Sequence, residues 1–292
     1  RVTENIDRVV IRFAGDSGDG MQLTGDRFTT VSALLGNDLA TLPDFPAEIR
    51  APQGTLAGVS AFQVHISGEP INTPGDAPDV LVVMNPAALR NELHHLPKGG
   101  VIMVNEDAFE PRNLEKAGYE ANPLEDGSLG NFTLYRITMS KNTREAVKAS
   151  GVKARDAERS KNFYALGILS WMYSRPLEPT LEWISEKFGK NPMVHDANVQ
   201  ALRAGHAFGE TAEMFDHRYH IPPAEQDSGV YTSINGNTAL SWGLIAAGQL
   251  AKLPLFLGSY PITPASDILH ELAKHKNFGV LTFQAEDEIS AI

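Results

Sequence analysis

An unbroken apolar run at residues 80–84, Val-Leu-Val-Val-Met, constrains the fold of this chain more than any other feature. A strand that is apolar on both faces is typical of a parallel sheet covered by helices on either side. The run ends at Asn85-Pro86, and a proline suits the first turn of a helix, which we expect to reach His95. The sequence therefore predicts a strand–helix unit of an α/β domain.

The same alternation of short apolar strands and helices recurs along the first two thirds of the chain. The expected strands are 8–15, 58–66, 80–84, 100–105 and 132–138. The expected helices between them are 21–35, 86–95 and 111–117, and three more follow at 162–174, 181–188 and 191–215. Strands that alternate with helices in this way imply βαβ units and an open, mostly parallel sheet.

We expect a domain boundary near residue 220. Residues 216–228 are polar, contain Pro222 and Pro223 and lack periodicity, which is typical of a linker between domains at 1–215 and 229–292. In the second domain we expect a short strand at 230–234 and a helix at 238–250, with Asn237 as its N-cap. The sequence stops inside an expected helix, so we expect this domain to be truncated, through a fragment or a proteolysed chain.

Composition excludes several classes of function. With 25 basic and 36 acidic residues, a net charge of −11 argues against nucleic acid as the main partner. No apolar run approaches the roughly 20 residues of a membrane span, and the polar start lacks a signal-peptide core, so we expect a cytoplasmic location. Cysteine is absent, so any cysteine-held iron–sulfur cluster must lie on another chain. The histidine pairs, such as His217 and His220, lack a completing carboxylate, so we expect no metal site on this chain alone.

A glycine-rich turn follows the first expected strand. Residues 15–20 read Gly-Asp-Ser-Gly-Asp-Gly and lead into a helix, an arrangement that can cradle phosphate at the helix N-terminus. The spacing differs from the dinucleotide fingerprint, and the aspartates disfavour a simple phosphate nest. The glycines therefore either hold an anion or only close the turn.

Residues 41–55 are rich in proline and are predicted to form an ordered loop without regular structure. Loops of this length are often functional. Glu48 and Arg50 lie on it, and they form either a functional pair or a surface ion pair of little energetic value.

The second domain contains an unusually stiff loop. An apolar strand at 253–257 is broken by Gly258, and Tyr260-Pro261-Ile262-Thr263-Pro264 follows. The prolines fix their own φ angles and hold the residues before them extended. We expect the Thr263 hydroxyl to point into a cleft beyond the strand end, with a helix at 265–275.

This loop resembles the Tyr-Pro-Ile-Thr-Pro motif of the 2-oxoacid:ferredoxin oxidoreductases. Asp267 and Ile268 continue the resemblance, residues 284–289 (Gln-Ala-Glu-Asp-Glu-Ile) match a second motif, and residues 46–55 resemble the gamma domain of the family. The resemblance implies a large, fused gamma–alpha subunit, with a Rossmann-like gamma domain followed by the start of a thiamine-diphosphate pyrimidine-binding domain. The subunit alpha of 2-oxoglutarate:ferredoxin oxidoreductase fits best.

The resemblance also implies roles for particular residues. Glu288, with Glu286 as the alternative, would hydrogen-bond N1′ of the thiamine aminopyrimidine, and Thr263 would hydrogen-bond the substrate carboxylate or 2-oxo oxygen. Tyr260, Pro261 and Ile262 would complete this side of the cofactor site. The residues implied to hold coenzyme A are Arg50, Gly15, Ser17, Gly18, Asp19 and Gly20.

The implied reaction interconverts 2-oxoglutarate and coenzyme A with succinyl-CoA and CO₂, using ferredoxin, as in CO₂ fixation by a reductive TCA cycle. Activity would require a beta subunit that carries Mg²⁺, the diphosphate site and a [4Fe-4S] cluster, in a heterotetramer built as a dimer of heterodimers. Pyruvate or a branched-chain 2-oxoacid is the alternative substrate. A non-catalytic scaffold subunit is the alternative class, and a nucleotide-binding dehydrogenase is disfavoured by the glycine spacing.

Overall fold

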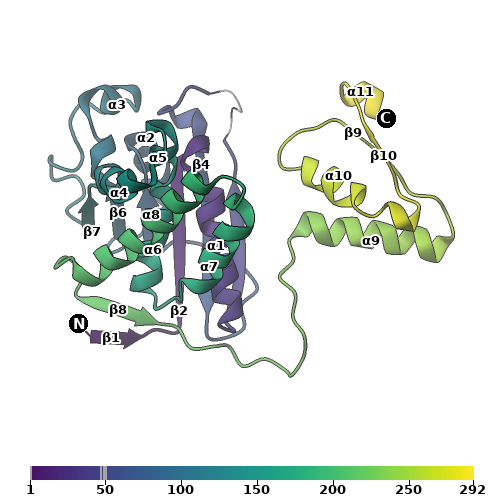
Figure 1. Cartoon of the computed structure of the whole chain (residues 1–292), viewed down its shortest axis with the longest axis horizontal. Coiled ribbons are helices and arrows are strands. Elements are labelled where there is room, and N and C mark those ends of the chain that lie inside the picture. Colours follow the sequence, from purple (N-terminus) through teal and green to yellow (C-terminus); the bar gives the residue numbers. More distant parts are fainter. Residues whose placement is uncertain (1, 47, 49–50) are drawn as a thin grey trace. The chain divides into compact units, whose positions relative to one another are not determined.

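The structure, a computed structural model, describes residues 2–46, 48 and 51–292, and it divides into two compact units at 1–227 and 228–292 (Figure 1). Within the described residues, no helix is both long enough and apolar enough to span a bilayer.

The first unit is built on a six-stranded sheet with the order β3-β4-β2-β5-β6-β7. Four adjacent strands are parallel: β2 (Arg8–Asp16), β5 (Val80–Val83), β6 (Val101–Asn105) and β7 (Thr133–Ile137). The strand β4 (Val59–Ser67) runs antiparallel to both β2 and β3 (Asp38–Asp44). The predicted open, mostly parallel α/β sheet is confirmed.

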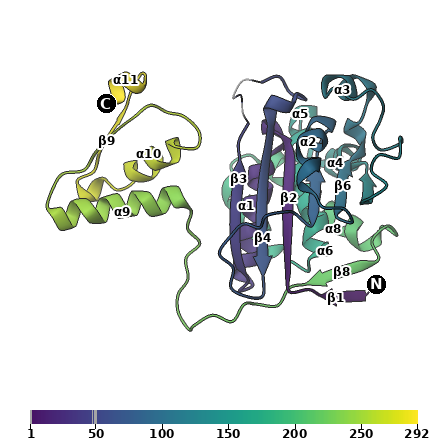
Figure 2. The ribbon, with the colours of Figure 1, turned by 180° about the vertical axis from the view of Figure 1, so that it is seen from behind.

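Helices cover both faces of this sheet, as Figures 1 and 2 show from opposite sides. Alternate residues of β5 enter two different hydrophobic clusters, Val80 and Val82 in one and Leu81 and Val83 in the other. The helices of the unit are α1 (Met21–Leu34), α2 (Pro86–Glu92), α3 (Pro111–Lys116), α4 (Met139–Val147), α5 (Ala154–Arg159), α6 (Lys161–Met172), α7 (Glu178–Phe188) and α8 (Pro192–Thr211). A strand buried on both faces explains the unbroken apolar run.

Two sequence-based expectations for this unit were wrong in detail. Residues 41–44, expected in an irregular loop, lie in β3 at the edge of the sheet, where Pro43 is tolerated because an edge strand has one unpaired side. The helix expected to reach His95 ends at Glu92 and continues as a 3₁₀ turn over Leu93–His95.

The expected linker at 216–228 is partly ordered on the first unit. Strand β8 (His217–His220) pairs in parallel with β1 (Val2–Asn5). Arg218 Nε donates to the carbonyl of Trp171 at 3.1 Å, and Asn37 Nδ2 donates to the carbonyl of Pro222 at 2.7 Å. The compact units separate only after Asp227. Side-chain hydrogen bonds hold this polar segment, so hydrophobic periodicity gave no sign of its strand.

Helices α6 and α8 cross at two glycines. A Cβ on Gly205 would lie 1.9 Å from the Tyr164 carbonyl oxygen, and a Cβ on Gly167 would lie 2.1 Å from that of Leu202. Real Cβ atoms do not approach backbone oxygen so closely, so any side chain here would force the helices apart.

We therefore expect Gly205→Ala to lower the free energy of unfolding of the first unit by about 1–3 kcal/mol, because overpacking is not relieved by a rotamer change. Chemical denaturation followed by circular dichroism measures this. Arg203→Ala, on an exposed position of the same helix, is the control and should change the stability by less than about 0.5 kcal/mol. Equal stability of the two variants would contradict the packing argument.

The second unit is small. It contains α9 (Gly236–Ala251), β9 (Phe256–Ser259), α10 (Ser266–Ala273), β10 (Leu281–Gln284) and α11 (Glu288–Ala291), and β9 pairs in parallel with β10. Its buried cluster consists of Ile245, Leu272 and Val280. The strand expected at 230–234 is absent from these described residues, and the N-cap of α9 is Asn235 rather than Asn237, since Asn235 accepts from the Thr238 amide at 2.9 Å.

Candidate functional site

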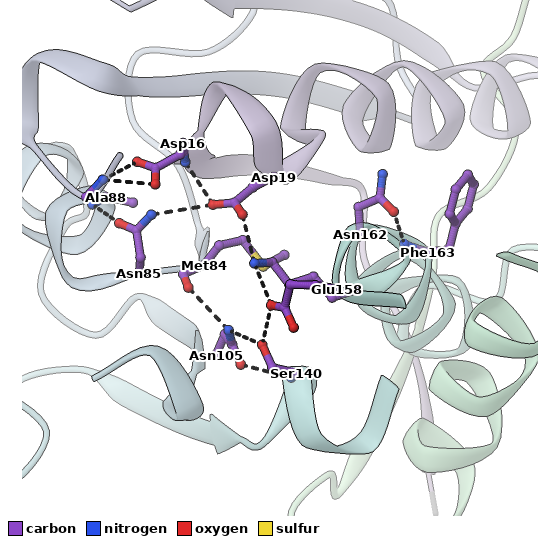
Figure 3. Close-up of polar contacts among 12 residues, drawn as sticks. Asp16, Asp19, Met84, Asn85, Ala88, Asn105, Ser140, Glu158, Asn162 and Phe163 are labelled. Carbon is purple, nitrogen blue, oxygen red and sulfur yellow. Dashed lines mark hydrogen bonds and ion pairs between the residues drawn. The ribbon is translucent and has the colours of Figure 1, made fainter. Parts of the chain in front are cut away.

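A cleft of about 790 Å³ opens where the parallel strands of the first unit end. Asp16 ends β2, Asn85 follows β5, and Asn105 ends β6, and all three line the cleft (Figure 3). In open α/β sheets, ligands bind at the carboxyl ends of the strands. This cleft is therefore the candidate binding site of the first unit, and Gly18 and Asp19 of the predicted glycine-rich turn line it.

The glycine-rich turn is closed by its own carboxylates. Asp19 Oδ2 accepts from the Asp16 amide at 2.9 Å, and the Asp16 carboxylate accepts from the Gly54 amide at 3.0 and 3.2 Å. A Cβ on Gly15 would lie 2.8 Å from Asp19 Oδ2, and Gly20 has φ of 74°. Gly15 and Gly20 are thus required by the turn itself, which favours the simpler interpretation of these two residues.

The acidic turn is electrostatically unsuited to phosphate. Burial raises the pKa of the Asp16 carboxyl, and the neighbouring Asp19 carboxylate raises it further. A phosphate placed against Asp16 and Asp19 would add like charge to this pair. The predicted phosphate contact with the helix N-terminus therefore meets an electrostatic obstacle that the glycine pattern alone did not reveal.

A buried lysine neutralises the floor of the cleft. Lys161 Nζ lies 2.8 Å from Asp19 Oδ1 and 3.1 Å from Glu158 Oε1, and the side chain is 11% exposed. Burial opposes the charge on Lys161, but Asp19 and Glu158 outweigh it and raise the pKa of the ammonium. Burial also opposes the charge of Glu158, yet Lys161, Ser140 and Arg144 together lower its pKa. Lys161 and Glu158 therefore both keep their charge at neutral pH.

Amide side chains at the strand ends connect this floor to the sheet (Figure 3). Asn85 Nδ2 donates to Asp19 Oδ2 at 3.4 Å while its Oδ1 accepts from the Ala88 amide, which caps α2. Asn105 Nδ2 donates to Ser140 Oγ at 3.1 Å, and Ser140 donates to Glu158 Oε1 at 2.9 Å. The positions of Asp19 and Glu158 are therefore fixed from two sides.

The wall of the cleft formed by α3, α4 and α5 carries four cations, beside the acidic Glu110 and Glu158. Lys116, Arg144, Arg155 and Arg159 line it. Arg144 pairs with Glu158 at 3.2 Å and Arg159 lies 3.7 Å from Asp156. Lys116 and Arg155 have no carboxylate partner within the part of the chain that the structure describes. We call these four residues the basic wall, and two of its cations are free to contact an anion.

The site residues that the sequence predicts for the first unit do not all lie at the cleft. Gly18 and Asp19 line the cleft, whereas Arg50 lies outside the described residues. Lys161 and the basic wall were missed, because they come from helices far along the chain. The polar residues Asn85 and Asn105, placed directly after apolar strands, were the one signal that sequence analysis could have used.

The second unit places its two predicted motifs at the carboxyl ends of β9 and β10, which we call the edge formed by these strands. Ser259 and Gln284 are paired at the carboxyl ends of the parallel strands β9 and β10. The loop carrying Tyr260 and Thr263 leaves the first strand there, and the segment carrying Glu288 leaves the second. Motifs separated in the sequence are thus neighbours at a strand edge, as sites in α/β sheets require.

Glu288 is the first residue of α11 and Asp287 is its N-cap, accepting from the Ser290 amide at 2.7 Å. Hydrogen bonds from Ser290 lower the pKa of Asp287, so this carboxylate is committed to capping. Glu286, Glu288 and Thr263 are exposed. Across the described residues of both units, no cluster of histidine and acidic side chains could hold a metal ion.

Comparison with protein families gives two matches. Residues 10–208 match the model for "Pyruvate ferredoxin/flavodoxin oxidoreductase". Residues 247–292 match the model for "Pyruvate flavodoxin/ferredoxin oxidoreductase, thiamine diP-bdg", which describes a thiamine-diphosphate-binding domain. The first match covers the cleft and the second covers the edge formed by β9 and β10.

Individual relatives agree with these matches. The chain is 59% identical to the 2-oxoglutarate oxidoreductase subunit KorA of Mycobacterium tuberculosis, over 99% of this chain and 44% of that protein. It is 27% identical to the 2-oxoacid:ferredoxin oxidoreductase 1, subunit alpha, of Aeropyrum pernix, over 50% of this chain and 23% of that protein. Among solved structures, the 2-oxoglutarate:ferredoxin oxidoreductase of Magnetococcus marinus, determined with 2-oxoglutarate, coenzyme A and succinyl-CoA bound, superposes with a TM-score of 0.72 and 29% identity, over 98% of this chain and 44% of that one. The chain therefore spans less than half the length of these relatives.

Proposed function

The chain belongs to the pyruvate ferredoxin/flavodoxin oxidoreductase family, and from this premise we propose that it acts as the alpha subunit of a 2-oxoglutarate:ferredoxin oxidoreductase. The reaction would interconvert 2-oxoglutarate and coenzyme A with succinyl-CoA and CO₂, with ferredoxin as electron carrier. The observation that supports this most strongly is 59% identity over nearly the whole chain to a 2-oxoglutarate oxidoreductase subunit.

The edge formed by β9 and β10 fits the pyrimidine side of thiamine diphosphate. Two segments leave adjacent parallel strands there, one with a hydroxyl at Thr263 and the other with carboxylates at Glu286 and Glu288. Bound thiamine diphosphate supplies the nucleophilic carbon needed to cleave a 2-oxoacid, which no side chain provides. Glu288 would hold a proton at N1′, Tyr260 and its neighbours Pro261 and Ile262 would position the ring, and Thr263 would orient the 2-oxoacid.

We further propose that the cleft of the first unit holds coenzyme A. The electrostatics assign different parts of the ligand to different sides. The basic wall, with Lys116 and Arg155 unpaired among described residues, suits the phosphates. The turn with Asp16 and Asp19 suits hydrogen-bond donors such as amide, hydroxyl or amine groups.

Replacing Lys116 and Arg155 by glutamine tests this assignment. We expect the double variant to raise the apparent KM for coenzyme A about 100-fold, because each charge-assisted hydrogen bond contributes about 1.5 kcal/mol, or roughly tenfold. The KM for the 2-oxoacid should not change. Arg203→Gln, on an exposed position of α8 outside the cleft, is the matched control.

Arg50→Ala should also weaken coenzyme A binding, and an unchanged KM for coenzyme A in this variant would remove Arg50 from the site.

The proposed activity requires a second polypeptide. We propose a beta subunit that carries Mg²⁺, the diphosphate contacts and a [4Fe-4S] cluster, in a dimer of heterodimers. Co-purification with that subunit, followed by mass measurement and metal analysis, tests the assembly. A stable and active homo-oligomer of this chain alone would contradict it.

The substrate assignment is tested separately in the assembled enzyme. Coenzyme-A-dependent reduction of ferredoxin should show a larger kcat/KM with 2-oxoglutarate than with pyruvate or a branched-chain 2-oxoacid. A preference for either alternative would keep the reaction class and replace the substrate. No turnover with any 2-oxoacid, in an assembly loaded with cofactor and cluster, would favour a scaffold role.

A further inference from the structure

A second cavity lies at the opposite end of the six-stranded sheet. It has a volume of about 460 Å³, which is within the range of small-molecule sites. Residues at the starts of β2, β5 and β6, the end of α6 and the strand β8 form its walls. It shares no lining residue with the cleft at the carboxyl ends of the strands, so it is separate from the site proposed above.

The cavity has an aromatic floor with an unused hydrogen-bond donor. Tyr173 is 2% exposed and stacks on Tyr219, with ring centroids 5.5 Å apart and planes at 27°. Tyr135 lines the same cavity. Tyr173 lines the cavity, and its hydroxyl oxygen is accessible and makes no hydrogen bond to another described residue, so a ligand in the cavity can reach it. Burial raises the pKa of Tyr173, so the phenol remains a neutral donor.

The rim of the cavity is basic. Arg8 and Lys98 line it, and neither pairs with a carboxylate in the described part of the chain, whereas His217, which also lines it, lies 3.8 Å from Glu4. The one acidic residue among the described lining residues is Asp79, whose Oδ2 accepts from the Val10 amide at 2.8 Å. In a chain with a net charge of −11, this rim is a local excess of positive charge that favours an anion.

We propose that this cavity is a binding site for a small, planar aromatic acid. The ring packs on the tyrosines, the carboxylate faces Arg8 and Lys98, and a polar atom elsewhere on the ligand accepts a hydrogen bond from Tyr173. A purely apolar ligand would leave the phenol unsatisfied, and an inorganic anion would leave the aromatic floor uncovered. The proposal does not depend on the catalytic function proposed above.

The site also has a structural connection to the rest of the chain. Strand β8 contributes His217 and Tyr219 to the cavity, pairs with β1, and is followed by the segment that leads to the second unit. The amide of Ile6 donates to the His220 carbonyl at 3.0 Å, beside the cavity wall. A bound ligand should therefore slow hydrogen exchange in β1 and β8, which locates binding independently of affinity.

The test uses 4-hydroxybenzoate as the probe, titrated into this chain and followed by saturation-transfer difference NMR. We expect saturable binding with a dissociation constant of roughly 1 mM or below. Tyr173→Phe keeps the ring and should weaken binding about fivefold or more through loss of one hydrogen bond. The double variant Arg8→Gln, Lys98→Gln should weaken it about tenfold, and this rim variant leaves the buried floor intact.

Two controls sharpen the result. Cyclohexanecarboxylate has the charge without the planar ring and should bind more weakly than the probe. The double variant Lys116→Gln, Arg155→Gln changes only the other cleft and should bind the probe normally. The proposal is overturned if 4-hydroxybenzoate shows no saturable binding, if neither cavity variant weakens it, or if the Lys116 and Arg155 variant abolishes it. Protection from hydrogen exchange confined to the second unit would overturn it as well.

Discussion

Replacing Glu288 by glutamine should reduce turnover of the assembled enzyme by about 10²–10⁴-fold, the usual effect of losing a positioned acid–base group. Glutamine keeps the shape and the helix position of Glu288, but it cannot stabilise a proton at N1′ of the cofactor. Exchange of the cofactor C2 proton should collapse in parallel, which proton NMR of the acid-quenched complex measures. Binding of thiamine diphosphate should weaken much less, because we place its diphosphate contacts on the partner subunit.

Glu286→Gln is the matched control for this experiment. Both glutamates are exposed and flank Asp287, whose side chain caps α11 through the Ser290 amide, so neither substitution removes the cap. We expect Glu286→Gln to retain C2 exchange. The reverse pattern, with normal exchange in Glu288→Gln and loss in Glu286→Gln, would transfer the role to Glu286. Normal exchange in both variants would remove this segment from cofactor activation.

The fold of the first unit was predictable because burial leaves a pattern in the sequence. The unbroken apolar strand β5 and the helix that starts at Pro86 follow directly from local rules. Strand β8 and the edge strand β3 were not predictable in this way. Their pairing depends on partners distant in the sequence, such as β1 for β8 and β4 for β3, and on side-chain bonds such as that of Arg218.

The candidate sites of the two units also differ in how far the sequence alone could predict them. Thr263 and Glu288 were found from local motifs, and pairing of β9 with β10 brings those motifs to one edge. The charge balance of the cleft could not be predicted, because Asp19 meets Lys161 only after α6 packs against the sheet. A glycine-rich turn looks the same in sequence whether the residues around it attract or repel phosphate. Three-dimensional contacts, rather than the turn, decide which side of the cleft suits an anion.

Replacing Thr263 by valine should impair 2-oxoacid turnover while leaving C2 exchange of the cofactor nearly normal. Valine keeps the branched shape in a loop fixed by Pro261 and Pro264, so the backbone should not rearrange. A hydrogen bond to a charged group contributes about 1.5–3 kcal/mol, which corresponds to a roughly 10- to 100-fold lower kcat/KM for the 2-oxoacid. Steady-state kinetics with varied 2-oxoglutarate at saturating coenzyme A measures it.

Ser266→Ala, which removes a nearby hydroxyl at the start of α10, controls for a general disturbance of the loop and should keep normal turnover. The pair of results then separates two roles at one edge of the second unit. Loss of C2 exchange in Glu288→Gln together with its survival in Thr263→Val would assign cofactor activation to the segment after β10 and substrate orientation to the loop after β9. Normal turnover in Thr263→Val would show that the Tyr260 to Pro264 loop serves only as a rigid turn, since the proposed hydroxyl contact would then contribute nothing to the reaction.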